Sequence, residues 1–222
     1  MDNAKRLLFY QRNLSKMMAD FPDFLYRYRP GNSLNTETKE LYDIEALLND
    51  KIWLSRADQF NDPFDSLYRI NGELMNNQDI TFAASFAESY KDICMWSHYA
   101  NYHKGFCLEY KFSDAKCLPI YYSKEIDIDI PCMQSTFIKS LIWENELEWR
   151  YADQSILAIE NRYKAGYLID YIRPTSIYLG YNYHRVPELT EKLKHVAVTK
   201  GINLYYMDYS LEKNKLFRKE FL

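Results

Sequence analysis

The succession of short apolar segments limits the folds open to this chain more than any other feature. Segments with strand-like alternation lie at 24–29, 52–55, 80–87, 106–112, 118–125, 176–182 and 203–210. Helical spacing appears at 35–51, 132–143 and 187–201. The two kinds of segment do not alternate with the regular strand–helix–strand rhythm of a doubly wound sheet. We therefore expect an α+β fold.

The chain shows the organisation of one domain. Its 222 residues fall within the usual size of a single domain, and no internal repeat or Pro/Gly/Ser linker divides them. We expect one domain over 1–222, with an amphipathic helix at 1–20. Only 6 glycines are present, and neither a dinucleotide fingerprint nor a phosphate-binding loop of the Walker type occurs.

The charge pattern favours a cytoplasmic protein without a membrane partner. No apolar run approaches the roughly 18–20 residues that span a bilayer, and charges interrupt residues 1–20 throughout. The cysteines at 94, 107, 117 and 132 have no CxxC spacing, so we expect reduced, buried thiols and no structural zinc. A net charge of −3 gives no general attraction to nucleic acid. The 21 tyrosines fit either a tyrosine-rich core or an aromatic binding surface.

The segment WENELEWR, residues 143–150, carries the most suggestive charge pattern. If it forms a strand, Glu146, Glu148 and Arg150 share one face, and Leu147 and Trp149 share the other. Such a face is either a solvated row of weak ion pairs or part of a chemical site. The sequence leaves both interpretations open.

Three further stretches carry candidate site residues. In LYRYRP, Arg27 and Arg29 share a strand face and have the geometry to bind phosphate or carboxylate, or they form a solvated edge. FNDPFD supplies Asp62 and Asp65, which favour a turn over a metal site. MWSHYANYHKGF offers side chains that suit either ligand stacking or the core. These are Trp96, His98 and Tyr99.

Several of these stretches together resemble the bacterial family called domain of unknown function 2971. The likeness rests on LYRYRP, IEALLNDKIWLSRADQFNDPFDS, MWSHYANYHKGFCLEY and the Lys-x-x-x-Trp-Glu-x-Glu-x-Glu-Trp-Arg run that begins at Lys139. It covers residues 24–209, in the same order. Members are associated with anti-phage or toxin-like contexts, which the resemblance suggests for this chain.

More distantly, the order of elements is similar to that of the ADP-ribosyltransferase superfamily. This likeness implies a compact domain of short mixed or antiparallel strands in two small sheets with flanking helices, and an NAD-binding cleft between the sheets. Carried over, the basic position is Arg27 or Arg29, the hydroxyl is Ser55 and the late glutamate is Glu148. Glu146 takes the extra acid of the Glu-x-Glu variant. The chain departs from the pattern by lacking a Ser-Thr-Ser triplet, by a short gap before Ser55 and by an arginine after the glutamates.

The resemblance implies an NAD-consuming effector, a toxin or an anti-phage defence protein, that uses NAD as substrate. Catalysis is assigned to Glu148 and Glu146. Ligand binding is assigned to Arg27, Arg29, Ser55, Trp96, His98, Tyr99 and Arg150. Protein, nucleic acid and water stay open as acceptors. Two alternatives remain: a metal-dependent nuclease using Asp62, Asp65, Glu146 and Glu148, and a non-enzymatic sensor or interaction module.

Overall fold

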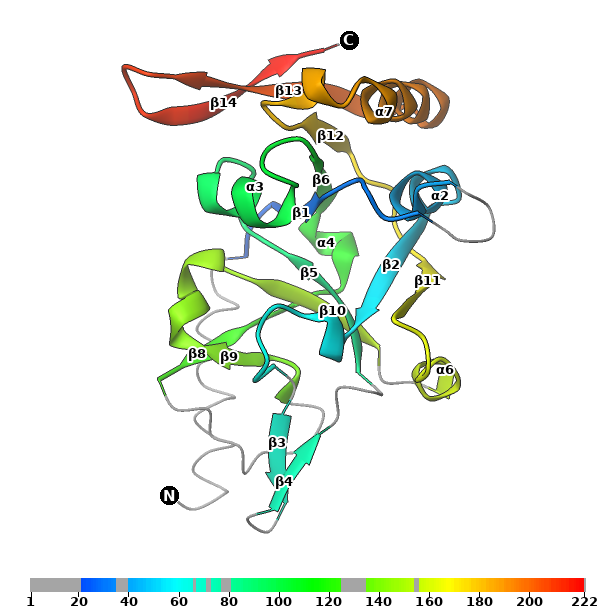
Figure 1. The fold of residues 1–222 in the computed structure, drawn as a ribbon, viewed down its shortest axis with the longest axis vertical. Helices are drawn as coiled ribbons and strands as arrows, with labels where there is room; N and C mark the ends of the chain where they lie inside the picture. Colours follow the sequence, from blue (N-terminus) through cyan, green and yellow to red (C-terminus); the bar gives the residue numbers. More distant parts are fainter. Residues whose placement is uncertain are drawn as a thin grey trace.

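The fold contains helices and short strands, as Figure 1 shows in a ribbon view of the computed structural model. The structure describes residues 21–34, 40–65, 67–70, 73–76, 81–124, 135–153 and 156–221. The helix expected at 1–20 lies outside these residues. Two five-stranded sheets form the body of the domain, and the expectation of an α+β fold with two main sheets is confirmed.

The first sheet has the strand order β1-β6-β12-β13-β14. Its strands are β1 (Phe24–Arg29), β6 (Phe106–Lys111), β12 (Ser176–Leu179), β13 (Asn203–Ser210) and β14 (Lys215–Glu220). Only the β12–β13 pair is parallel, and helix α7 (Pro187–Lys200) makes the crossover between them, as a parallel pair requires. Gly201 ends α7 in the left-handed conformation, as its position predicts.

The second sheet has the order β11-β2-β5-β10-β7, with antiparallel neighbours throughout. Its strands are β2 (Lys51–Arg56), β5 (Phe82–Phe86), β7 (Leu118–Pro119), β10 (Trp149–Asp153) and β11 (Gly166–Asp170). Helix α2 (Tyr42–Leu48) leads into β2. A backbone bridge between Tyr26 and Ala87 ties β1 to the end of β5 and so joins the two sheets.

Shorter elements connect and flank the sheets. They are the helices α3 (Ile93–Tyr99), α4 (Phe112–Ala115) and α6 (Ile156–Glu160), the 3-10 turns η1 (Ala57–Gln59), η2 (Leu141–Glu146) and η3 (Tyr183–Arg185), and the strand pairs β3 (Leu67–Ile70) with β4 (Glu73–Asn76) and β8 (Tyr121–Ser123) with β9 (Ile138–Ser140). The β3–β4 hairpin lies at the opposite end of the molecule from α7 and β14 (Figure 1). No helix among the described residues is long and apolar enough to cross a membrane.

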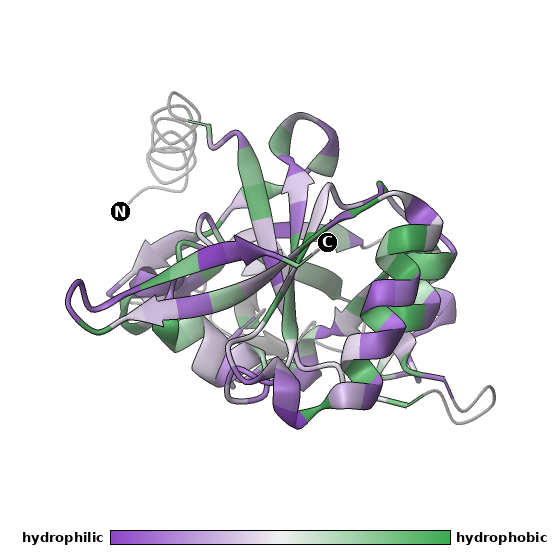
Figure 2. Cartoon of the chain, turned by 90° about the horizontal axis from the view of Figure 1, so that it is seen from above, coloured by the Kyte–Doolittle hydropathy of each residue, from purple (hydrophilic) through white to green (hydrophobic). Residues whose placement is uncertain are grey.

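One apolar core joins the two sheets. It takes Leu25 from β1, Ile177 from β12, Leu54 from β2, Phe86 from β5 and Trp149 from β10. Polar and apolar residues alternate around α7, and Figure 2 shows this helix along one side of the sheets. Its apolar side chains, including Leu193 and Val196, complete the core. Because both sheets share this core, the position of one sheet fixes that of the other.

Strand β1 has two different faces, as its alternation predicts. Leu25 joins the core between the sheets, whereas Tyr26 and Tyr28 join a second cluster around Trp96. Tyr26 also donates a hydrogen bond to the buried carboxylate of Glu109 at 3.2 Å. These tyrosines therefore belong to the core with their hydroxyls bonded, in keeping with the first of the two interpretations of the tyrosine content.

Some expected elements differ from the structure. The helix expected at 132–143 is wrong over 138–143, where β9 and the start of η2 stand. The strand β14 was not expected, because KLFRKE has too few apolar residues to predict a strand. It forms a strand by pairing with β13. Cys94 is exposed rather than buried, while Cys107 and Cys117 are buried, and all three are free thiols.

Candidate functional site

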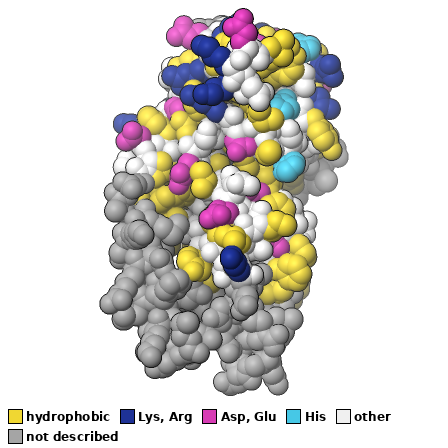
Figure 3. Space-filling view, turned by 90° about the vertical axis from the view of Figure 1, so that its left-hand side faces the viewer, with side chains coloured by type: hydrophobic (Ala, Val, Ile, Leu, Met, Phe, Trp, Pro, Cys, Tyr) yellow, Lys and Arg dark blue, Asp and Glu magenta, His cyan; other side chains and the backbone are white. Residues whose placement is uncertain are grey.

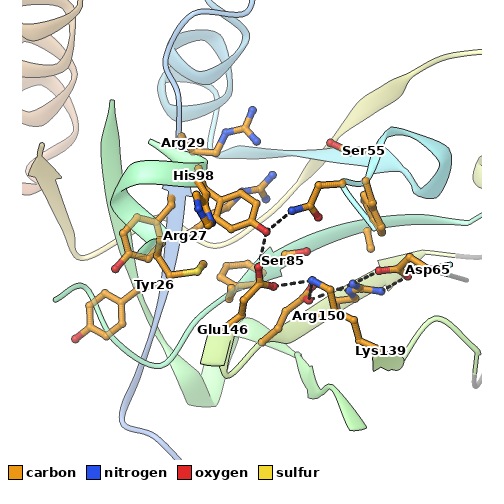
Figure 4. Close-up of a pocket in the computed structure, with 18 of the residues that line it drawn as sticks. Tyr26, Arg27, Arg29, Ser55, Asp65, Ser85, His98, Lys139, Glu146 and Arg150 are labelled. Carbon is orange, nitrogen blue, oxygen red and sulfur yellow. Dashed lines mark hydrogen bonds and ion pairs between the residues drawn. The ribbon is translucent and has the colours of Figure 1, made fainter. Parts of the chain in front are cut away.

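A pocket of about 370 Å³ opens where the two sheets approach each other. Residues from β1, β2, β5, α3, β9, η2 and β10 line it. Eight of the nine residues that the sequence nominated are among them: Arg27, Arg29, Ser55, His98, Tyr99, Glu146, Glu148 and Arg150. Figure 4 shows the two arginines of β1 on one side of the pocket and Glu146 with Arg150 on the other.

The acidic side of the pocket is built on a buried ion-pair network. Arg150 holds Asp65 with both terminal nitrogens, at 2.7 and 2.6 Å, and donates from Nε to Glu148 Oε1 at 2.6 Å. The side chain of Arg150 is only 1% exposed and that of Glu148 only 4%. The hypothesis of a solvated charged row is therefore wrong for Glu148 and Arg150.

Lys139 on β9 links the two glutamates. Its Nζ lies 2.6 Å from Glu146 Oε2 and 3.0 Å from Glu148 Oε2. Glu146 also accepts a hydrogen bond from the Tyr99 hydroxyl at 2.5 Å, and Asn61 donates to that hydroxyl at 2.6 Å. The pocket thus brings together side chains that are up to 124 positions apart in the sequence, namely Tyr26 and Arg150.

The network keeps Glu148 ionised. Burial alone would raise the pKa of this carboxyl, but the charges of Arg150 and Lys139 outweigh burial and lower the pKa to about 2. The same partners act on the cations: burial opposes the charge of Lys139, yet the two glutamates raise its pKa above the ordinary value. At neutral pH these buried groups are all charged, and they offset one another.

The basic side of the pocket contains a buried charge without a carboxylate partner. Arg27 is 4% exposed, and its Nη2 donates to the Trp53 carbonyl at 2.6 Å. Its Nη1 has no hydrogen-bond partner among the described residues, none of whose carboxylates forms an ion pair with it. Burial, with the nearby charge of Arg29, lowers the pKa of Arg27 to about 10. Arg29 differs, because its Nε is paired with Asp43 at 2.6 Å.

An unsatisfied guanidinium in such a place suits an anionic ligand. A buried polar group that lacks a partner is costly, and burial of a charge costs more. Arg27 is among the residues that line the pocket, and its unpartnered Nη1 is itself buried. A phosphate or carboxylate in the pocket would supply the missing acceptor and the missing charge.

Ser55 and His98 line the pocket, but Trp96 does not. Ser55 lies on β2, opposite Ala83 of β5, and Figure 4 places it near the arginine side. Trp96 is fully buried, donates from its indole nitrogen to the Tyr90 carbonyl at 2.7 Å, and packs edge-on against Tyr28. Its assignment as a ligand-binding residue is therefore corrected to a core residue.

The segment WENELEWR is not one continuous strand. η2 ends at Glu146, Leu147 adopts a left-handed conformation with φ 44°, and β10 begins only at Trp149. Glu146 and Glu148 consequently do not meet through strand alternation. The turn at Leu147 brings both carboxylates to Lys139, while Leu147 itself points outward and is 48% exposed.

The carboxylates of FNDPFD have two separate environments. Asp62 caps its own turn by accepting from the Phe64 backbone N–H at 3.0 Å, and it does not line the pocket. Asp65 lines the pocket and is held by Arg150. Within the part of the chain that the structure describes, His, Cys, Asp and Glu side chains form no group able to hold a metal ion. The amino group of Lys139 lies between Glu146 and Glu148, and the guanidinium of Arg150 lies between Glu148 and Asp65. These cations occupy the positions between the carboxylates where the nuclease alternative needs a metal ion.

The pocket residues that the sequence did not nominate include Lys139, Ser85 and Asn61. Lys139 was quoted only as the start of a motif, and it lay within the wrongly expected helix. Ser85 faces the pocket from β5 opposite Arg150 and forms a hydrogen bond with Glu148. Asn61 belongs to FNDPFD, whose residue types predict a turn. In the structure Lys139 also contacts Trp143, whose ring centroid lies 4.7 Å from the lysine nitrogen.

A second groove, of about 740 Å³, lies beside the β13–β14 hairpin. Lys91, Lys213 and Lys215 line it together with Glu212 and Phe217. Figure 3 shows basic side chains gathered at this end of the molecule with acidic ones among them. Three lysines and one glutamate make the lining of this groove mostly basic, whereas the first pocket has both an acidic and a basic side.

The chain was compared with known protein families, curated proteins and solved structures. No family model, no curated protein and no solved structure matches the chain.

Proposed function

We propose that the protein is an ADP-ribosyltransferase-like, NAD-consuming effector that acts in phage defence or as a toxin. The observation that carries the proposal is the buried, half-satisfied guanidinium of Arg27 facing an acidic cluster across one pocket. A ligand that suits such a pocket carries an anion at one end and a cationic or hydroxyl-rich group at the other. NAD has both, in its pyrophosphate and its nicotinamide-ribose.

The acidic side supplies what cleavage of the nicotinamide–ribose bond needs. That bond breaks through a transition state with positive charge on the ribose, comparable to the one in glycoside hydrolysis. Fixed negative charge near the ribose stabilises it, and a carboxylate can take the proton of the attacking group. Glu146 and Glu148 are the carboxylates proposed for these roles, and both are bonded to Lys139.

The size of the pocket bears on how NAD is held. Its volume of about 370 Å³ lies at the lower end of the range of small-molecule sites. The pocket encloses the nicotinamide-ribose and the nearest phosphate, and the adenylate half projects outside. His98 and Tyr99 on α3 border the pocket and supply its aromatic wall. The likeness to the family called domain of unknown function 2971 supports the defence context.

The experiment is incubation of the purified chain with NAD and chromatographic measurement of released nicotinamide. We expect release by the native protein and loss of at least ten-fold in Arg27→Met, which removes the unpaired guanidinium. Binding of NAD without its consumption would favour the sensor alternative. Absence of both binding and consumption would refute the proposal, and Mg²⁺-dependent cleavage of nucleic acid would replace it with the nuclease alternative.

A further inference from the structure

The two glutamates of the pocket differ in what they have left to offer a ligand. A carboxylate has about four positions at which it accepts hydrogen bonds. Glu148 Oε1 accepts from Arg150 Nε at 2.6 Å, and Oε2 accepts from Lys139 at 3.0 Å and from Arg150 Nη2 at 3.2 Å. A hydrogen bond with Ser85 takes the fourth. Glu148 is therefore saturated by the protein itself.

Glu146 keeps unused accepting positions. Its Oε1 accepts from the Tyr99 hydroxyl and its Oε2 from Lys139. Two of about four positions are filled, and its side chain is 11% exposed against 4% for Glu148. Glu146 lies at the end of η2, just before the left-handed Leu147. Figure 4 shows Glu146 directed toward the open space of the pocket.

The hydrogen bonds of Glu146 also fix its orientation. Tyr99 comes from α3, and its hydroxyl is itself held by Asn61 at 2.6 Å. Lys139 approaches from β9 on the other side. A carboxylate held by two groups from different elements has one defined direction, so its free lone pairs have a defined direction as well.

We propose that Glu146 is the carboxylate that touches the ligand and that Glu148 is a positioning residue. This assignment rests on the proposed function and departs from the resemblance, which assigns catalysis to Glu148 together with Glu146. Glu148 holds Lys139 and Arg150 in place, and Lys139 then holds Glu146. The ribose and the incoming acceptor meet Glu146 alone.

The chemistry of this step is balanced without a further reactant. The bond between the ribose anomeric carbon and the pyridinium nitrogen breaks, and its electron pair leaves with nicotinamide, which becomes neutral. An oxygen or nitrogen of the acceptor forms the new bond to that carbon. The proton of the acceptor passes to Glu146, which releases it to solvent. With water as acceptor, the products are ADP-ribose, nicotinamide and one proton.

The experiment compares Glu146→Gln with Glu148→Gln in nicotinamide release at saturating NAD, with thermal unfolding measured for both. We expect Glu146→Gln to keep its melting temperature within a few degrees and to lose at least about 100-fold in rate, the lower end of what a general base contributes. A double variant, Lys139→Met with Glu148→Gln, removes one cation and one anion together. It is expected to retain at least ten-fold more activity than Glu146→Gln, because Glu146 is intact.

The outcomes separate this inference from the proposed function. A folded Glu148→Gln variant that is inactive beside an active Glu146→Gln variant overturns the inference and leaves the function standing. Inactivity of the native protein toward NAD refutes the function. In that case carbodiimide coupling to glycinamide, read by mass spectrometry, still decides the assignment: labelling of Glu146 and not Glu148 supports it, and the reverse overturns it.

Discussion

Replacement of Arg27 by methionine is expected to leave the protein as stable as before, or more stable, while ligand binding is lost. Burial and the neighbouring Arg29 lower the pKa of Arg27 from 12.5 to about 10. At about 1.4 kcal/mol per pH unit, this gap means that the folded protein penalises the charge by about 3.5 kcal/mol. Methionine removes that penalty and keeps an apolar side chain of similar length.

Two favourable interactions are lost in the same substitution. The hydrogen bond from Nη2 to the Trp53 carbonyl contributes about 1.5–3 kcal/mol, as is usual for a charged donor. The contact of the guanidinium with the Phe86 ring, at 5.8 Å, is replaced by an apolar contact. The balance is a free energy of unfolding that is raised by about 0.5–2 kcal/mol. Urea titration with tryptophan fluorescence measures it.

Arg29→Met is the matched control on the same face of β1. Arg29 is paired with the buried Asp43, and removal of one partner of a buried pair strands the other charge, at a cost of about 3 kcal/mol or more. At about 2–4 °C per kcal/mol for a chain of this size, its melting temperature should fall by about 6–12 °C. If Arg27→Met destabilises the fold as much as Arg29→Met does, the charge of Arg27 is compensated and the case for an anion site fails.

Three further predictions concern stability and specificity. Because Arg150 and Lys139 lower the pKa of Glu148 to about 2 from 4.5, its ionisation contributes about 3.5 kcal/mol above pH 4.5. That contribution is lost as the pH falls toward 2, so Glu148→Gln should flatten the pH dependence of urea unfolding between pH 5 and 2.5; an unchanged slope would contradict the ion-pair network. Leu147→Gly relieves an exposed left-handed residue and should raise the unfolding free energy by about 0.5–1 kcal/mol, with a decrease counting against the turn geometry. Trp96→Phe leaves the Tyr90 carbonyl unpaired and should lower the free energy of unfolding by about 2 kcal/mol, without changing NAD affinity. Weaker NAD binding at equal stability would show that Trp96 contacts the ligand.

The sequence predicted those features that depend only on neighbouring residues in the chain. LYRYRP shows which residues share each face of β1, and the glycine after 187–200 shows where α7 ends. The sequence could not show which face of β1 is covered. A strand with two arginines on one face reads equally well as an edge strand in water. Only the second sheet, brought close by the bridge at Ala87, turns that face into a pocket wall.

The acidic side of the pocket was predicted for a partly wrong reason. The alternation of Glu146, Glu148 and Arg150 suggested one strand face, whereas the structure uses a 3-10 turn and a left-handed leucine. Leucine gives no sequence signal for that conformation, which glycine or asparagine would give. Lys139 escaped notice because the apolar spacing of 132–143 reads as a helix, and its strand depends on pairing with β8.

The central claim, that this pocket binds NAD through an unpaired buried arginine, is tested most directly by calorimetric titration of NAD into the native protein and into Arg27→Met. We expect saturable binding to the native chain, and affinity lowered at least ten-fold in a variant that is folded and no less stable. Equal affinity of the two proteins, or no binding to the native chain, would contradict the claim.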